Sequence, residues 1–105
     1  MADSHEPERF HVRLDGTRVV RLPAAEMTRD DALAAVAFQE RELQLTQGLA
    51  APALALLQRV ADGDQSVLRW ELHRAREMAE TLVRVQQQTD RLRAAVQARQ
   101  PVAAD

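Results

Sequence analysis

The segment "ELHRAREMAE", residues 71–80, gathers the side chains of this sequence that are best suited to chemistry. Histidine and glutamate can hold a metal ion or transfer protons where a fold closes a site around them. At the 100° per residue of an α-helix, His73, Glu77 and Glu80 fall within one narrow arc. A metal site in a helical bundle would need ligands from a second helix, as in proteins with Glu-x-x-His repeats. The segment has no such repeat, and His5 and His11 lie far from it along the chain.

The same arc has the properties of a solvated helix face. His73 with Glu77, and Glu80 with Arg84, form i,i+4 pairs of the kind that modestly stabilise an exposed helix. Arginines share this side of the helix, at positions Arg69, Arg76, Arg84 and Arg91. We therefore interpret the cluster as surface and predict no metal site.

Residues for covalent catalysis are scarce. The chain has no cysteine, and all 14 of its basic residues are arginine, so thiol and lysine chemistry are excluded. Its only serines are Ser4 and Ser66, and its three glycines are explained by turns and helix ends rather than by a phosphate-binding loop. The sequence predicts a protein that is not an enzyme, with no catalytic residue and no cofactor.

The composition bounds the class of protein. A chain of 105 residues fits one domain with a modest core, so part of its apolar surface is expected to need a partner. The net charge of −2 and the pI of about 5.9 disfavour nucleic acid and anionic membranes as partners. No apolar run approaches the roughly 20 residues of a membrane span, and the polar, acidic start lacks a secretory signal. We expect a cytoplasmic protein, and its arginine and alanine bias is typical of a GC-rich bacterium or phage.

Residues 9–23, "RFHVRLDGTRVVRLP", predict a β-hairpin around Asp15 and Gly16, because Asp-Gly between alternating apolar residues favours a tight turn. A two-residue loop would place Phe10, Val12, Leu14 and Val19 on one face. A three-residue bulged loop would instead join Phe10 and Val12 to Val20 and Leu22, and we prefer it because it buries more carbon and leaves arginines on the other side. Pro23 should end the second strand. A lone hairpin is marginal in water, so it must lean on helices or extend a sheet in another chain.

Residues 24–99 are predicted to be helical, between a flexible lead-in at 1–8 and a flexible tail at 100–105. The first helix begins at an N-cap, Thr28, and ends at Gly48. Pro52 suits the start of a second short helix, which Gly63 ends. Asp64 or Ser66 is expected to cap a third helix that runs to about Arg99, a length of ~50 Å.

The third helix is amphipathic. Its a and d heptad positions form a stripe of about four heptads, typical of a bundle or coiled-coil seam. The stripe consists of Leu68, Glu71, Ala75, Met78, Leu82, Val85, Thr89, Leu92 and Val96. Packing on the chain's own shorter helices would cover part of it. Because those helices are predicted to be much shorter, the C-terminal half should stay partly uncovered, and a second copy is the simplest cover.

The first helix carries apolar residues on two sides, so it needs two partners. One stripe consists of Leu33, Val36, Ala37 and Leu43, and the other consists of Ala34, Phe38, Leu45 and Leu49. The hairpin and the third helix could cover both, or one stripe could be an intermolecular surface.

Trp70 lies off the apolar stripe of the third helix, beside Arg74. One interpretation is a ring covered by the hairpin, with a cation–π contact to Arg74. The other is an anchor for a second protein, since tryptophan and arginine are favoured at binding hot spots.

Together these patterns predict a mainly α fold, in which an N-terminal β-hairpin precedes two short helices and one long amphipathic C-terminal helix, arranged like a helical bundle or coiled coil. The predicted function is a non-catalytic, oligomerising assembly or adaptor protein of a bacterium or phage. Its partners would be further copies of itself, as a dimer or higher oligomer, or another protein, with no membrane. The predicted protein interface comprises Leu68, Ala75, Met78, Leu82, Val85, Leu92, Val96, Phe38, Leu45 and Trp70.

The alternative function is a small nucleic-acid-binding regulator. Arginines on the hairpin would meet phosphates in a β-ribbon mode, and they are Arg9, Arg13, Arg18 and Arg21. The acidic balance and the near absence of aromatic stacking residues weigh against this function.

Overall fold

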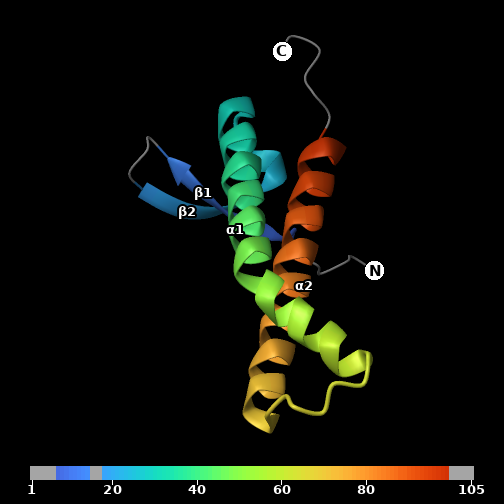
Figure 1. Cartoon of the computed structure of the whole chain (residues 1–105). Helices are drawn as coiled ribbons and strands as arrows, with labels where there is room; N and C mark the ends of the chain where they lie inside the picture. Colours follow the sequence, from blue (N-terminus) through green and yellow to red (C-terminus); the bar gives the residue numbers. More distant parts are fainter. Residues whose placement is uncertain (1–6, 15–17, 100–105) are drawn as a thin grey trace. The chain divides into compact units, whose positions relative to one another are not determined.

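The computed structural model describes residues 7–14 and 18–99, and it is mainly helical with an N-terminal antiparallel hairpin. The strands are β1 (Arg9–Leu14) and β2 (Arg18–Pro23), followed by a short 3-10 helix, η1 (Ala24–Glu26). Two long helices follow, α1 (Arg29–Ala61) and α2 (Arg69–Ala98), as Figure 1 shows. The coarse fold class is therefore confirmed. Residues 1–6 of the predicted lead-in at 1–8, the Asp15-Gly16 turn and the predicted tail at 100–105 lie outside the described residues.

The hairpin has the register of the three-residue loop. Phe10 pairs with Leu22 and Val12 pairs with Val20, which is the pairing predicted for the three-residue loop and not that of the two-residue loop. Val12 is only 1% exposed, so the face that these four residues share is the buried one. Burial of carbon decides the register, because a slip by one residue would turn the arginines inward.

The prediction of two short helices before α2 is wrong. α1 is one helix of 33 residues that continues through Gly48 and contains Pro52 in its interior. Interior glycine costs roughly 1 kcal/mol and interior proline about 3 kcal/mol. Burial outweighs both costs. Leu43 and Ala50 before Pro52 and the partly buried Ala53 after it lie on one face of the uninterrupted helix. Figure 1 shows the expected result of an interior proline, a change in the direction of α1 before the loop.

The predicted start of α2 also needs correction. Thr28 does cap α1, since its Oγ1 accepts a hydrogen bond from the backbone N–H of Asp31 at 3.0 Å. α2, however, begins at Arg69, and neither Asp64 nor Ser66 is its cap. Glu71 folds back instead, and its Oε1 accepts the backbone N–H of Leu68 at 3.0 Å. This is the reciprocal half of a capping box, without the serine or threonine that normally precedes it.

α1 ends at Ala61, just before Gly63, the glycine that was predicted to end the second short helix. Gly63 has a positive φ of 98°, which an L-residue adopts at a cost and glycine adopts freely. The N–H of Gly63 bonds the carbonyl of Val60 at 3.0 Å, and the N–H of Asp64 bonds that of Arg59 at 2.9 Å. These two bonds form a Schellman motif, which satisfies the last carbonyls of α1.

The described residues belong to two compact units. Unit 1 contains those of Met1–Gln39 and Asp90–Asp105, and unit 2 is Glu40–Thr89. The core of unit 1 is made by the hairpin, the segment before α1, the start of α1 and the end of α2. Its buried members are Val12, Met27, Ala32, Ala35 and Leu92, and Phe10, Val20, Leu22, Val36 and Val96 pack against them. The hairpin thus leans on helices of its own chain, as one of the two predicted alternatives required.

Unit 2 consists of the rest of α1, the loop and the first part of α2. Each helix has buried positions, Leu43 and Ala50 on α1 and Ala75 and Thr89 on α2. Three of these four side chains are small, so the buried part of unit 2 holds little apolar volume. Most of its large apolar side chains are therefore only partly buried or exposed.

Candidate functional site

The histidine–glutamate cluster of α2 lies in solvent. Nε2 of His73 is 3.1 Å from Oε1 of Glu77, and both side chains are well over half exposed. An Nη of Arg84 donates to Oγ1 of Thr81 at 3.3 Å, so this arginine is also engaged along the helix surface. Within residues 7–14 and 18–99, no group of three or more His, Asp or Glu side chains is placed to hold a metal ion.

The structure divides the predicted protein interface into three groups. Ala75 and Leu92 are buried by the chain itself, so a partner has no access to them. The partly buried residues are Met78, Leu82, Val85 and Val96. The exposed residues are Phe38, Leu45, Leu68 and Trp70. Only the last group offers a partner large apolar side chains.

Leu45 and Leu49 form the most exposed apolar pair of α1 in unit 2. Their exposed fractions are 57% and 69%, and their i,i+4 spacing places them on one face of the helix. Leu49 belongs to the second stripe predicted on the first helix, and its size and spacing would have justified including it in the interface. Leu54 is also exposed, at 44%, but helical rotation places it about 140° away from Leu49.

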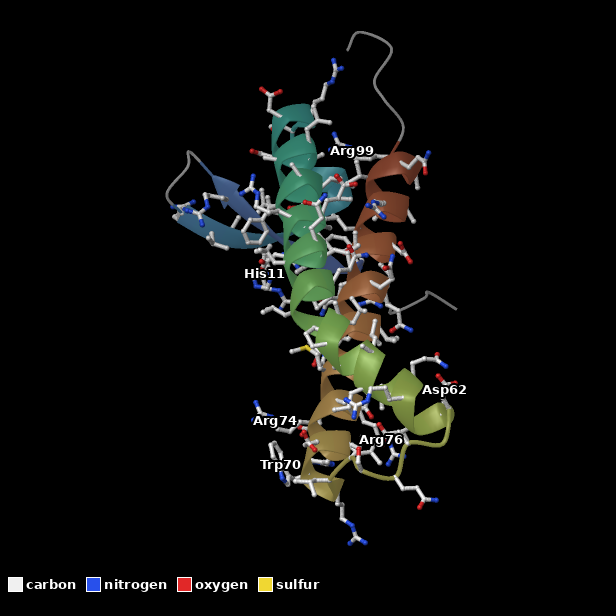
Figure 2. The ribbon with its side chains drawn as sticks, in the orientation of Figure 1. His11, Asp62, Trp70, Arg74, Arg76 and Arg99 are labelled. Atoms are coloured by element: carbon white, nitrogen blue, oxygen red, sulfur yellow. The ribbon has the colours of Figure 1, made fainter. Side chains whose placement is uncertain are left out.

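Trp70 and Arg74 lie next to each other at the start of α2, and both point outward in Figure 2. Trp70 is 59% exposed, and the packing within unit 2 therefore leaves most of this residue uncovered. Leu68, two residues earlier, is 55% exposed. An exposed indole beside an arginine is the composition favoured at protein-binding hot spots.

The outer face of the hairpin carries four basic side chains and one exposed apolar residue, Val19, which pairs with Arg13. The register places Arg9, His11, Arg13 and Arg21 on the side opposite Val12, and all four side chains are exposed. Arg18 pairs with Leu14 at the end of the ribbon and lies on the other face of β2 from Arg21. The four predicted nucleic-acid contacts therefore do not share one face. His11, which Figure 2 labels, takes its place. The period-2 alternation of a strand is the signal that would have found it.

The loop between α1 and α2 carries one perturbed carboxyl. Ser66 donates to Oδ1 of Asp64 from its hydroxyl at 2.6 Å and from its backbone N–H at 2.8 Å. Arg59 donates from Nε to Oδ2 at 2.9 Å. The hydrogen bonds from Ser66, followed by those of Arg59, lower the pKa of Asp64 from 3.8 to about 2. Their effect is to fix the loop rather than to activate the carboxyl, because an acid with this pKa is ionised throughout the physiological range.

No family model, curated protein or solved structure matches the chain. In the part that the structure describes, no helix has an apolar stretch long enough to cross a bilayer. Two exposed features of the described residues are suited to binding another molecule, and they are the apolar residues of unit 2 and the basic side chains of the hairpin.

Proposed function

We propose that this chain is a non-catalytic assembly or adaptor protein that associates with further copies of itself through the exposed apolar residues of unit 2. A heterologous protein partner is the second possible occupant of the same residues. We further propose a cytoplasmic protein of a GC-rich bacterium or its phage, because arginine supplies all 14 basic residues.

The exposed pair Leu45 and Leu49 is the observation that carries the proposal. Removing a leucine side chain from water contributes about 1.5–3 kcal/mol to the free energy of association. Burying two neighbouring leucines against a partner would therefore stabilise a complex substantially. Singly scattered apolar residues on a surface are ordinary, whereas adjacent large ones on one helix face favour contact with another protein. Helix packing, with leucines seated between side chains of a facing helix, is the mode that such a face fits.

Helix length does not support this proposal. The prediction that α2 is much longer than the helices before it is wrong, since α1 has 33 residues and α2 has 30. The support comes from the exposure of Leu45 and Leu49 on α1 and of Leu68 and Trp70 on α2.

The test is the molar mass in solution as a function of protein concentration, measured by light scattering after size exclusion. For the unmodified chain we expect the mass to rise above the monomer value of 11.8 kDa as concentration increases. The double substitution Leu45→Gln/Leu49→Gln should weaken association at least ~10-fold, because it removes more than 1.4 kcal/mol of apolar contact.

Leu54→Gln is the matched control, since Leu54 is also an exposed leucine of α1 but lies on another side of the helix. It should leave the mass profile unchanged. A chain that stays at 11.8 kDa at all concentrations would contradict self-association. Equal weakening by Leu54→Gln would show that apolar content in general, and not this face, drives it.

A further inference from the structure

We propose that the outer face of the hairpin binds the phosphate backbone of duplex DNA, with the two-stranded ribbon seated in the major groove. This inference concerns a surface of unit 1 and does not depend on the apolar residues of unit 2.

The register brings the basic side chains to one face. Arg9, His11 and Arg13 are alternate residues of β1, and Arg21 lies opposite His11 on β2. Alternate residues of a strand point to the same side, about 7 Å apart. All four side chains are exposed, while the opposite face is held in the core of unit 1 through Val12. One face of the hairpin therefore packs in the core of unit 1, and the four basic side chains on its other face are open to solvent.

The charge of the hairpin differs from that of the chain. Residues 9–23 hold four arginines and one acidic residue, a formal charge of +3 within a chain of net charge −2. The nearest acidic residue in sequence, Glu8, is engaged elsewhere, because its Oε2 accepts from Nε of Arg91 at 3.0 Å. Arg9 uses one donor on the carbonyl of Arg21, at 3.3 Å, and a guanidinium has five. Arg9 thus keeps further donors for anionic oxygens.

The shape and composition of this face select duplex DNA among polyanions. The major groove of B-DNA admits a two-stranded β-ribbon, whereas that of A-form RNA is too narrow for side chains to read. Single-stranded nucleic acid is held largely by stacking on aromatic rings. The one aromatic residue of the hairpin, Phe10, packs against the core of unit 1 on the other face. Arginine pairs with phosphate and with carboxylate through the same two parallel hydrogen bonds, so an acidic polypeptide is included in the experiment as a competing ligand.

The experiment is a fluorescence anisotropy titration of the full chain into a labelled, mixed-sequence DNA duplex at several salt concentrations. We expect binding that weakens with salt, and the substitution Arg9→Gln/Arg13→Gln/Arg21→Gln should weaken it at least tenfold at low salt. Each lost phosphate contact should also lower the magnitude of the log–log salt slope by about 0.9.

The matched control is Arg69→Gln/Arg76→Gln/Arg84→Gln, which removes the same charge from exposed positions of α2. It should bind as the unmodified chain does. Arg9→Lys/Arg13→Lys/Arg21→Lys keeps the charge and should retain most of the affinity. Binding by this variant would show that replacing these three side chains does not unfold the hairpin, so that weaker binding by the glutamine variant reflects lost contacts. Circular dichroism spectra should be the same for all variants.

Three results would overturn the proposal. The first is no binding at low salt, and the second is equal weakening by the two glutamine variants, which would reflect net charge alone. The third is binding of labelled polyglutamate or of single-stranded DNA as tight as that of the duplex, which would point to an acidic protein or to a different nucleic acid.

Discussion

At the scale of single residues, Asp64 shows how hydrogen bonds to one carboxylate hold a small loop. Ser66 and Arg59 direct three donors at one carboxylate from both sides of the turn. Arg59 lies in the last turn of α1, so this carboxylate ties the end of the helix to the loop that follows. The geometry depends on the charged form of the acid, because a protonated carboxyl accepts these bonds less strongly.

The pH dependence of stability should reveal this role. The pKa of Asp64 is about 2 in the folded chain, below its ordinary value of 3.8. A carboxyl whose pKa is lower in the folded chain than in the unfolded chain stabilises the fold at pH values above its unfolded pKa. That stabilisation is lost as the pH falls through the folded pKa. We therefore expect Asp64→Asn to lower the free energy of unfolding at pH 7 and to make little difference near pH 2. Urea unfolding followed by circular dichroism at several pH values measures this.

Asp62→Asn is the comparison for that experiment. Asp62 accepts a single side-chain hydrogen bond, from Nε2 of Gln58 at 3.0 Å. Its replacement should change stability less at pH 7. If the two variants lose the same free energy of unfolding at neutral pH, the additional hydrogen bonds to Asp64 do not add stability.

At the scale of elements, the hairpin was predictable and α1 was not. Alternation in residues 9–23 determines which face is buried, so strand pairing and register follow from Phe10, Val12, Val20 and Leu22. Around Gly48 and Pro52, local signals indicated an end and a new start, yet the helix continues. The signal that would have corrected this is phase, because Leu43, Ala50 and Leu57 keep one heptad register across the proline.

Glycine substitutions test this account of α1 at two positions. Gly48 lies inside the helix, and an added Cβ there would meet no atom within 4 Å. Gly48→Ala should therefore raise the free energy of unfolding by about 0.5–1 kcal/mol. Gly63→Ala should lower it by about 1–2 kcal/mol, because the positive φ of 98° at that position strains any residue with a Cβ. Thermal or urea unfolding measures both.

An increase in stability for Gly63→Ala, or a decrease for Gly48→Ala, would contradict the assignment of Gly63 as the end of α1 and of Gly48 as an interior residue.

The candidate site could also be predicted only in part. Sequence periodicity indicated that Leu45 and Trp70 could be exposed, but not that Ala75 and Leu92 are buried by the chain itself. That distinction depends on which segments pack together, and helix periodicity contains no such information.

At the scale of the whole molecule, Trp70 can report association directly. It is the only tryptophan of the chain and is 59% exposed. If it lies in the interface, its emission should shift to shorter wavelength as protein concentration rises, because burial removes water from the indole. The measurement is the emission maximum over the concentration range used for light scattering.

The variant Leu45→Gln/Leu49→Gln serves as the control, since it should keep the emission of the dilute chain at every concentration. An increase in mass with no change in emission would place Trp70 outside the interface. It would leave Leu45 and Leu49 as the apolar residues through which the copies meet.

The uneven distribution of charge has a practical consequence for handling the protein. Fifteen residues carry a formal +3 while the whole chain carries −2, so the remainder carries −5. A surface recognises the region of opposite sign that it touches, and not the sum over the molecule. In dilute buffer at neutral pH, cation-exchange and anion-exchange resins should therefore both retain the chain, each through a different part of it.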